Sequence, residues 1–308
     1  MLKEQRFGVE VEMTGISRKK AADVLAEVFG AIAGEPDGTC YHTRIIKDQK
    51  DRKWKVMRDS SITPVRNDNS NAPMDEYRVE MVTPPLNYED IELLQVVIRK
   101  LRENGAKSHR SCGIHIHVDG ANHTAESLRR LVSFMTARQD LIYEALEIGD
   151  RENSWCHKLN KTLLNAMKKD KNLTNEKAEE IWYSSANDGY CGGIDHQHYN
   201  STRYHGVNLH AFFTKGTVEF RLFNSTLHAG KIKAYIQFCL AVSAWAITSN
   251  DKLVFRSMDN YTAEQKVTIM RNILTHRLGL YGDEFKTCRL HMMNPLKKAA
   301  GMAVREAA

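Results

Sequence analysis

The stretch RFGVEVEM, from Arg6 to Met13, decides the fold prediction because apolar and charged side chains alternate along it. In a strand, the four apolar residues at every second position share one face, and Glu10 and Glu12 share the other. Two carboxylates on one face of an apolar run require either solvent or a cation. The segment therefore predicts a strand with one buried face and one polar face.

The same alternation recurs in three later segments, CGIHIHVD (112–119), YRVEMVT (77–83) and GTVEFRLF (216–223). Their polar faces would carry His115, His117, Glu80, Glu219 and Arg221. An antiparallel sheet can bury one face under helices and leave the other open. We therefore expect an α+β protein in which several strands direct acidic, imidazole and guanidinium groups to a shared cleft.

Amphipathic periodicity places helices between these strands. The predicted helices are Ser17 to Phe29, Asn87 to about Gly105, Thr124 to about Ile148, Lys231 to Ser249 and Thr262 to Gly279. RYHGVNLHAFF and GTVEFRLFNSTL predict two strands joined by a hairpin turn at Thr214-Lys215-Gly216. We expect a single domain over 1–308, with a polar, partly helical insertion or lid at about 150–193. A C-terminal helix and a mobile basic tail, beginning after Pro295, would occupy 262–308.

Composition favours small anionic ligands over nucleic acid. The 308 residues include 44 basic and 38 acidic side chains, so the excess of positive charge is small.

The six cysteines form no C-x-x-C pair, and charged residues interrupt any apolar run at the N-terminus. We expect a reduced, cytoplasmic protein. The most apolar segment, about 234–247, is too short to span a bilayer, so we expect no membrane association.

The clustered carboxylates indicate a metal–nucleotide site. Glutamates gathered in one cleft repel one another unless cations lie among them. Oxygen-rich clusters with a few histidines suit Mg²⁺ or Mn²⁺, and Mg²⁺ often binds through phosphate groups. Arg203 and Arg221 would supply cations for those phosphates. Each motif alone is common on a solvated strand face, and only their joint placement favours the metal site.

Six motifs, in this order, resemble the amidoligase family: FGVEVEM, KVMRDSSI, VEMVTPPL, CGIHIHVD, RYHGVNL and GTVEFRLFNSTL, which together span about Arg6 to Leu227. This family is a branch of the carboxylate–amine ligases related to glutamine synthetase and glutamate–cysteine ligase. The resemblance implies a glutamine-synthetase-type catalytic fold, a curved antiparallel sheet in a half-barrel or funnel with helices on its outer face. It also implies ATP and Mg²⁺ (or Mn²⁺) as cofactors.

The resemblance assigns roles to individual residues. The implied metal ligands are Glu10, Glu12, Glu80, His115 and Glu219. His115 and His117, with Arg203, Asn208 and Arg221, would bind the nucleotide. Asp59, Arg203 and Arg221 would take part in catalysis, with Asp59 serving the metal or the amine. The segment 150–193 matches no motif, and we expect it to influence substrate choice.

The implied activity is ATP-dependent formation of an amide from a small-molecule carboxylate and an amine through an acyl phosphate. Three alternatives stay open: a guanidino-kinase-like phosphotransferase, a non-catalytic nucleotide-binding relative, and a nucleic-acid role for the basic segment Lys158 to Lys177. The sequence names neither substrate. It leaves open the pathway, a homo-oligomer, a partner enzyme that supplies ammonia or processes the product, and any ligand of His196, His198, His205 and His210.

Overall fold

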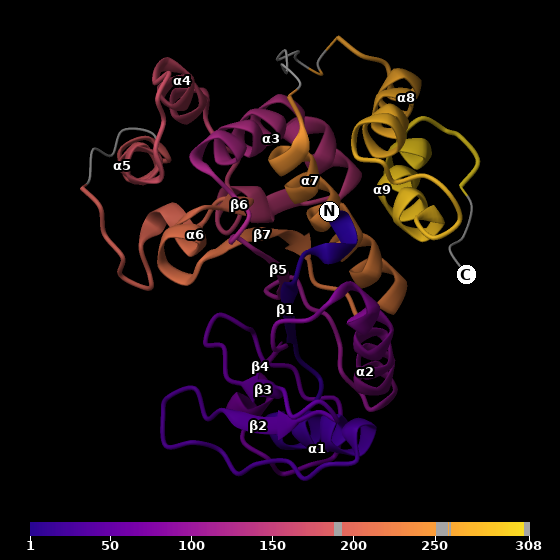
Figure 1. The fold of residues 1–308 in the computed structure, drawn as a ribbon. Helices are drawn as coiled ribbons and strands as arrows, with labels where there is room; N and C mark the ends of the chain where they lie inside the picture. The colour runs from indigo at the N-terminus through magenta and orange to yellow at the C-terminus, as the bar shows by residue number, and fades with distance from the viewer. Residues whose placement is uncertain (188–192, 251–257, 259, 305–308) are drawn as a thin grey trace. The chain divides into compact units, whose positions relative to one another are not determined.

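The protein is α+β, as expected from its alternating strands. The computed structural model describes residues 1–187, 193–250, 258 and 260–304. Its contacts divide the chain into two compact units. The N-terminal unit comprises Arg6–Ile116 and Phe223–Lys233, and the C-terminal unit comprises Met1–Gln5, His117–Leu222 and Ala234–Ala308. Figure 1 shows the elements of each unit in ribbon form.

Seven strands form an open sheet, hydrogen-bonded in the order β2-β3-β4-β1-β5-β7-β6. Their bounds are β1 Phe7–Met13, β2 Arg44–Lys47, β3 Lys53–Met57, β4 Val79–Val82, β5 Gly113–Asp119, β6 Val207–Asn208 and β7 Thr217–Asn224. The registers of β1 with β4, β2 with β3, β3 with β4, and β6 with β7 are antiparallel. The unit boundary falls within β5 and β7. This sheet confirms the predicted antiparallel architecture.

In the N-terminal unit, the apolar face of β1 is buried, as the alternation of its residues predicts. The apolar residues of β1 are at most 2% exposed. Helix α1 (Arg18–Phe29) contacts β2 and β3, and α2 (Ile91–Glu103) contacts α1. The Ser17 hydroxyl accepts the Lys20 amide and starts α1, and Gly30 ends it in the left-handed conformation. Strand β2 was not predicted, because RIIK carries apolar residues at only two adjacent positions.

The C-terminal unit is mainly helical. Its helices are α3 Ala125–Ala145, α4 Lys161–Lys169, α5 Asn175–Ser185, α6 His210–Lys215, α8 Ala263–Asn272 and α9 Lys286–Ala299, with a π-helical turn at Ile273–Arg277. Helix α7 (Ala229–Thr248) begins in the N-terminal unit and continues into this one. Short 3₁₀ helices occupy Leu2–Glu4, Met74–Tyr77, Tyr88–Asp90, Gly149–Asn153 and Ser201–Arg203. The predicted helices after Ser17, Asn87, Thr124 and Thr262 are confirmed.

Two predictions in the C-terminal unit were wrong. The segment His210–Lys215 is the helix α6 rather than the end of a strand, so Gly216 ends a helix and does not turn a hairpin. Strands β6 and β7 still pair, because α6 returns the chain antiparallel. The expected mobile tail after Pro295 is also wrong up to Ala299, since Pro295 lies within α9 and Leu296 is buried.

The segment predicted as an insertion has its own packing. Helices α4 and α5 contact each other and α3, and they bury Leu163, Leu164, Met167 and Trp182. The leucines and methionine therefore form an inner helix face, and the lysines of α4 lie outside it. A lid function for this segment stays a prediction. Residues 188–192 of this segment lie outside the described part of the chain.

Among the described residues, no helix combines the length and apolar character needed to cross a membrane. The five described cysteines, Cys40, Cys112, Cys156, Cys239 and Cys288, form no disulfide with one another. Cys191, the sixth, lies outside the described residues. Burial raises the pKa of Cys156 to about 11, so this thiol stays protonated near neutral pH.

Candidate functional site

Three predicted ligands meet in the N-terminal unit. Glu12, Glu80 and His115 each offer one ligand atom, and these atoms lie within 4.8 Å of one another. The residues are 5%, 9% and 4% exposed, respectively. Two nearly buried carboxylates at this separation repel each other, and a cation between them would offset that repulsion. The group has the donor chemistry of a small divalent-metal site.

The sheet register explains why these groups meet. Glu12 on β1 and Glu80 on β4 are Cα partners in antiparallel register, so their side chains emerge on the same face. His115 lies on β5, with its Nε2 3.6 Å from Oε1 of Glu12. The residues that flank Glu12 on β1, Val11 and Met13, are fully buried on the opposite face. The face division predicted from alternation thus positions the group.

Hydrogen bonds hold the same residues in place. The Gly113 amide donates to Oε2 of Glu12 at 2.6 Å. Nδ1 of His115 lies 2.9 Å from Oε2 of Glu10. This contact orients the imidazole so that its Nε2 is the atom directed to Glu12. Glu10 is therefore a neighbour that positions His115 within this unit.

A second group of predicted residues lies in the C-terminal unit. Glu219 on β7 accepts the Asn208 amide at 2.8 Å and the Arg221 guanidinium at 2.7 Å. Asn208 and Glu219 are Cα partners on β6 and β7. Nε2 of His117 lies 4.0 Å from Glu219, and its Nδ1 lies 2.9 Å from the Thr217 hydroxyl. Glu219, Arg221 and Asn208 are all buried, so this ion pair is shielded from water.

Arg203 and Arg221 both contact the aromatic ring of Tyr204, which links Arg203 to this second group. The guanidinium carbons of Arg203 and Arg221 lie 5.8 and 5.9 Å from the centre of the Tyr204 ring. Arg203 also donates to the His198 carbonyl at 2.7 Å and lies over Tyr199. Glu219 offsets the charge of Arg221, whereas Arg203 forms no ion pair among the described residues, so Arg203 supplies the excess positive charge here. This group can pair with an anion such as phosphate.

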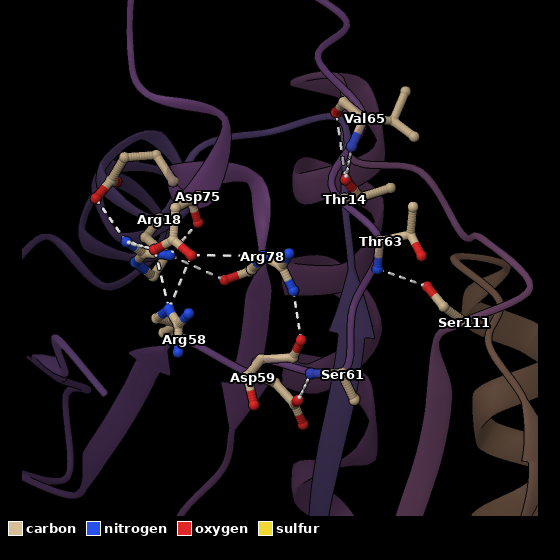
Figure 2. A network of polar contacts seen from close by, with 12 residues as sticks. Thr14, Arg18, Arg58, Asp59, Ser61, Thr63, Val65, Asp75, Arg78 and Ser111 are labelled. Atoms are coloured by element: carbon tan, nitrogen blue, oxygen red, sulfur yellow. Dashed lines mark hydrogen bonds and ion pairs between the residues drawn. The ribbon is translucent and has the colours of Figure 1, made fainter. Parts of the chain in front are cut away.

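Asp59 lies in a separate polar network of the N-terminal unit. Figure 2 shows that hydrogen bonds hold the loop from Asp59 to Val65 at several points. The Ser61 amide donates to Asp59 at 2.7 Å, and the Thr63 amide donates to the Ser111 hydroxyl at 2.9 Å. Val65 and Thr14 exchange two hydrogen bonds, of 2.7 and 3.2 Å. Asp59 therefore lies in a loop that hydrogen bonds hold in place. The role of Asp59 in binding the metal or the amine stays a prediction.

The hub of that network is Asp75, which the sequence prediction missed. Asp75 pairs with Arg58 at 2.9 Å, Arg18 at 3.3 Å and Arg78 at 3.4 Å (Figure 2). Burial acts to raise the Asp75 pKa, but Arg58 and Arg18 outweigh it and hold this pKa below its usual value. Arg78 also donates to the Ser60 carbonyl, beside Asp59. No sequence signal links Asp75 to the RDSS motif, because the pairing depends on loop folding.

The remaining histidines have local structural contacts. Nδ1 of His205 lies 2.9 Å from the Thr202 carbonyl, and Nδ1 of His210 lies 2.7 Å from the Tyr183 hydroxyl. Burial, followed by Arg203, lowers the pKa of His210. His196 pairs with Glu179 at 2.6 Å. Within the described residues, none of these histidines belongs to a group that could hold a metal.

Comparison with known proteins identifies one family. The family model described as "Putative amidoligase enzyme" matches residues 3–243. This span includes every predicted site residue, from Glu10 to Arg221. A search of curated proteins found no match.

Proposed function

Because the chain belongs to the amidoligase family, we propose that it is an ATP- and Mg²⁺-dependent ligase that joins a carboxylate to an amine. The observation that supports this proposal best is the group formed by Glu12, Glu80 and His115, whose ligand atoms lie within 4.8 Å of one another. The open antiparallel sheet with surrounding helices is consistent with a glutamine-synthetase-type fold, which we include in the proposal.

The donor set fits a divalent cation. Two carboxylates and one imidazole suit Mg²⁺ or Mn²⁺, which commonly bind through one or two carboxylates and the phosphates of a substrate. In this proposal Glu12, Glu80 and His115 hold the cation, and Glu10 orients the imidazole. When bound, the cation would offset the negative charge of the triphosphate.

The proposed reaction has two steps. An oxygen of the substrate carboxylate attacks the γ-phosphorus of ATP, the bond to the β-phosphate oxygen breaks, and ADP leaves. The amine nitrogen then attacks the acyl carbon, the bond to the phosphate oxygen breaks, and inorganic phosphate leaves as the amide forms. The amine must lose a proton, which the Asp59 carboxylate would accept.

The arginines and the amide of the C-terminal unit would act on phosphate. Arg221 is buried and fixed by Glu219, so its remaining guanidinium N–H groups keep one orientation. Arg203 would contribute a second cation, and Asn208 would fix Glu219. Donors fixed before the reaction stabilise developing charge without reorganisation.

The test is product formation from mixed substrates. The purified protein is incubated with ATP, Mg²⁺ and pools of amino acids and polyamines, and ADP, inorganic phosphate and new masses are measured. A ligase releases equal amounts of ADP and phosphate and yields an amide whose mass identifies both substrates. Glu219→Ala and Arg221→Lys should reduce turnover about 100-fold or more.

Glu92→Gln is the matched control, because Glu92 is an exposed carboxylate on α2 and should leave turnover unchanged. Release of ADP without free phosphate would instead indicate a phosphotransferase. ADP release no higher than that of Glu219→Ala in every pool would contradict the ligase proposal.

A further inference from the structure

The C-terminal unit contains a cavity outside the span of the family match. It has a volume of about 600 Å³ and is lined by α8, the following π-helical turn, the connection to α9, and α9 itself. All its lining residues lie between Arg271 and Ala303, whereas the family match ends at residue 243. None of them belongs to the candidate functional site, so the proposed ligase reaction does not explain this cavity.

The charge of the lining is strongly one-sided. Four basic side chains, Arg271, Lys286, Arg289 and Lys297, face one acidic side chain, Asp283. The neighbouring carboxylate of Glu284 pairs with Lys3 at 2.7 Å. Across the described part of the chain, Arg271, Lys286 and Lys297 form no ion pair. Asp283 offsets only one of the four positive charges, so the lining keeps an excess of positive charge.

One of the cations is already oriented. Nη1 of Arg289 donates to the Leu280 carbonyl at 2.8 Å, and the Leu280 amide in turn donates to the Leu274 carbonyl at 2.8 Å. These two bonds fix the guanidinium against the loop that precedes α9. A guanidinium has five N–H groups, so Arg289 retains further donors. A fixed fork of this kind matches the oxygens of a phosphate group.

The apolar part of the lining and the volume of the cavity further limit the class of ligand that fits. Leu290, Met293 and Ala303 contribute apolar surface beside the cations. A volume of about 600 Å³ falls within the usual range for sites of small organic ligands. Duplex nucleic acid instead contacts a basic stripe along an extended surface. The cavity thus combines anion-binding groups, apolar walls and small-molecule size.

We propose that this cavity binds a small phosphorylated molecule, with its phosphates on Arg271, Lys286, Arg289 and Lys297 and its apolar part against Leu290 and Met293. The site is independent of the ligase site and requires no divalent cation. It would give the protein a second ligand besides the substrates of the proposed reaction.

The test uses inorganic pyrophosphate as the probe and isothermal titration calorimetry as the measurement, with EDTA present and ATP absent. The double variant Arg271→Gln/Lys297→Gln should weaken pyrophosphate binding about 10-fold or more. The reason is that it removes two positive charges whose hydrogen bonds to the phosphates contribute to the binding free energy. Lys298→Gln is the matched control, since Lys298 is exposed on α9 but does not line the cavity. Circular dichroism and thermal melting check that all variants fold.

Further measurements separate this site from its alternatives. Glu12→Gln should leave pyrophosphate binding unchanged, because Glu12 belongs to the candidate ligase site. Citrate, which carries carboxylates in place of phosphates, should bind more weakly than pyrophosphate. The proposal is overturned if pyrophosphate does not bind, if citrate binds as tightly, or if Glu12→Gln abolishes binding while the double variant does not. Preferential binding of duplex DNA that the double variant loses would also overturn it, in favour of a nucleic-acid surface.

Discussion

Glu12 lies directly opposite Glu80, as Cα partners on the antiparallel strands β1 and β4. Like charges placed opposite each other destabilise a strand pair. Both residues are less than one-tenth exposed, so solvent does little to screen the repulsion. Nε2 of His115 lies 3.6 Å from Oε1 of Glu12, and a cation bound between the two carboxylates would offset their remaining repulsion.

A divalent cation should therefore raise the stability of the protein. We expect Mn²⁺ or Mg²⁺ to increase the melting temperature, measured by differential scanning calorimetry with and without EDTA. Glu80→Gln should stabilise the metal-free protein by about 0.5–1 kcal/mol, because it removes the repulsion. The same variant should reduce the shift that the metal causes. A metal-dependent shift as large in Glu80→Gln as in the unmodified chain would contradict this assignment.

Acid should destabilise the protein through His123, which is buried in the C-terminal unit. Its Nδ1 contacts Ser127 and its Nε2 contacts Ser243, both at 2.9 Å. Burial, with Arg130 acting in the same direction, lowers its pKa from 6.5 to about 4. The unfolded chain therefore binds a proton below pH 6.5 that the folded chain excludes until about pH 4. Stability attributable to His123 is complete above this window and is lost as the pH falls through it.

The free energy of unfolding attributable to His123 should fall by about 3 kcal/mol across this pH window. His123→Gln should be less stable at pH 7, and its stability should fall less steeply between pH 6.5 and 4. His276→Gln, at an exposed position on the π-helical turn, is the control and should keep the original slope. Urea unfolding at a series of pH values measures both. An unchanged slope in His123→Gln would show that other groups cause the acid sensitivity.

Asp75→Asn should destabilise the N-terminal unit. The change removes the negative charge that Arg18, Arg58 and Arg78 share, and Arg18 is only 2% exposed. Because Asp75 itself is partly exposed, solvent screens part of this effect, and we expect a loss of about 1–2 kcal/mol. Asp23→Asn is the control, because it removes only an exposed pair with Lys19. Equal effects of the two substitutions on urea unfolding would argue against a hub at Asp75.

Gly206→Ala tests the close packing of the RYHGVNL motif. A Cβ at this position would overlap the Tyr143 hydroxyl, which donates to the Cys156 carbonyl at 2.8 Å. We expect a loss of about 1–3 kcal/mol, typical of overpacking. Tyr143→Phe removes the overlapping oxygen, so the double variant should be more stable than the sum of the single changes predicts. Strict additivity in thermal unfolding would show that the overlap is relieved elsewhere.

Sequence reasoning succeeded where a property depends on local periodicity. Alternation in RFGVEVEM and CGIHIHVD places Glu12 and His115 on polar strand faces, whatever the neighbouring strands are. It failed at His210–Lys215, because apolar residues in a short segment fit a helix as well as a strand. It also missed β2, whose pairing with β3 supplies stability that its own sequence does not indicate.

The sequence by itself determined the α+β class, most helix starts, and the residue types available for a metal–phosphate chemistry. Only the tertiary structure decided that Glu12 meets Glu80, that Asp75 gathers three arginines, and that cations of α8 and α9 surround one cavity. The physical reason is the range of the interactions. Side-chain periodicity and capping act within a few residues, whereas strand register, ion-pair networks and cavities depend on which distant segments pack together.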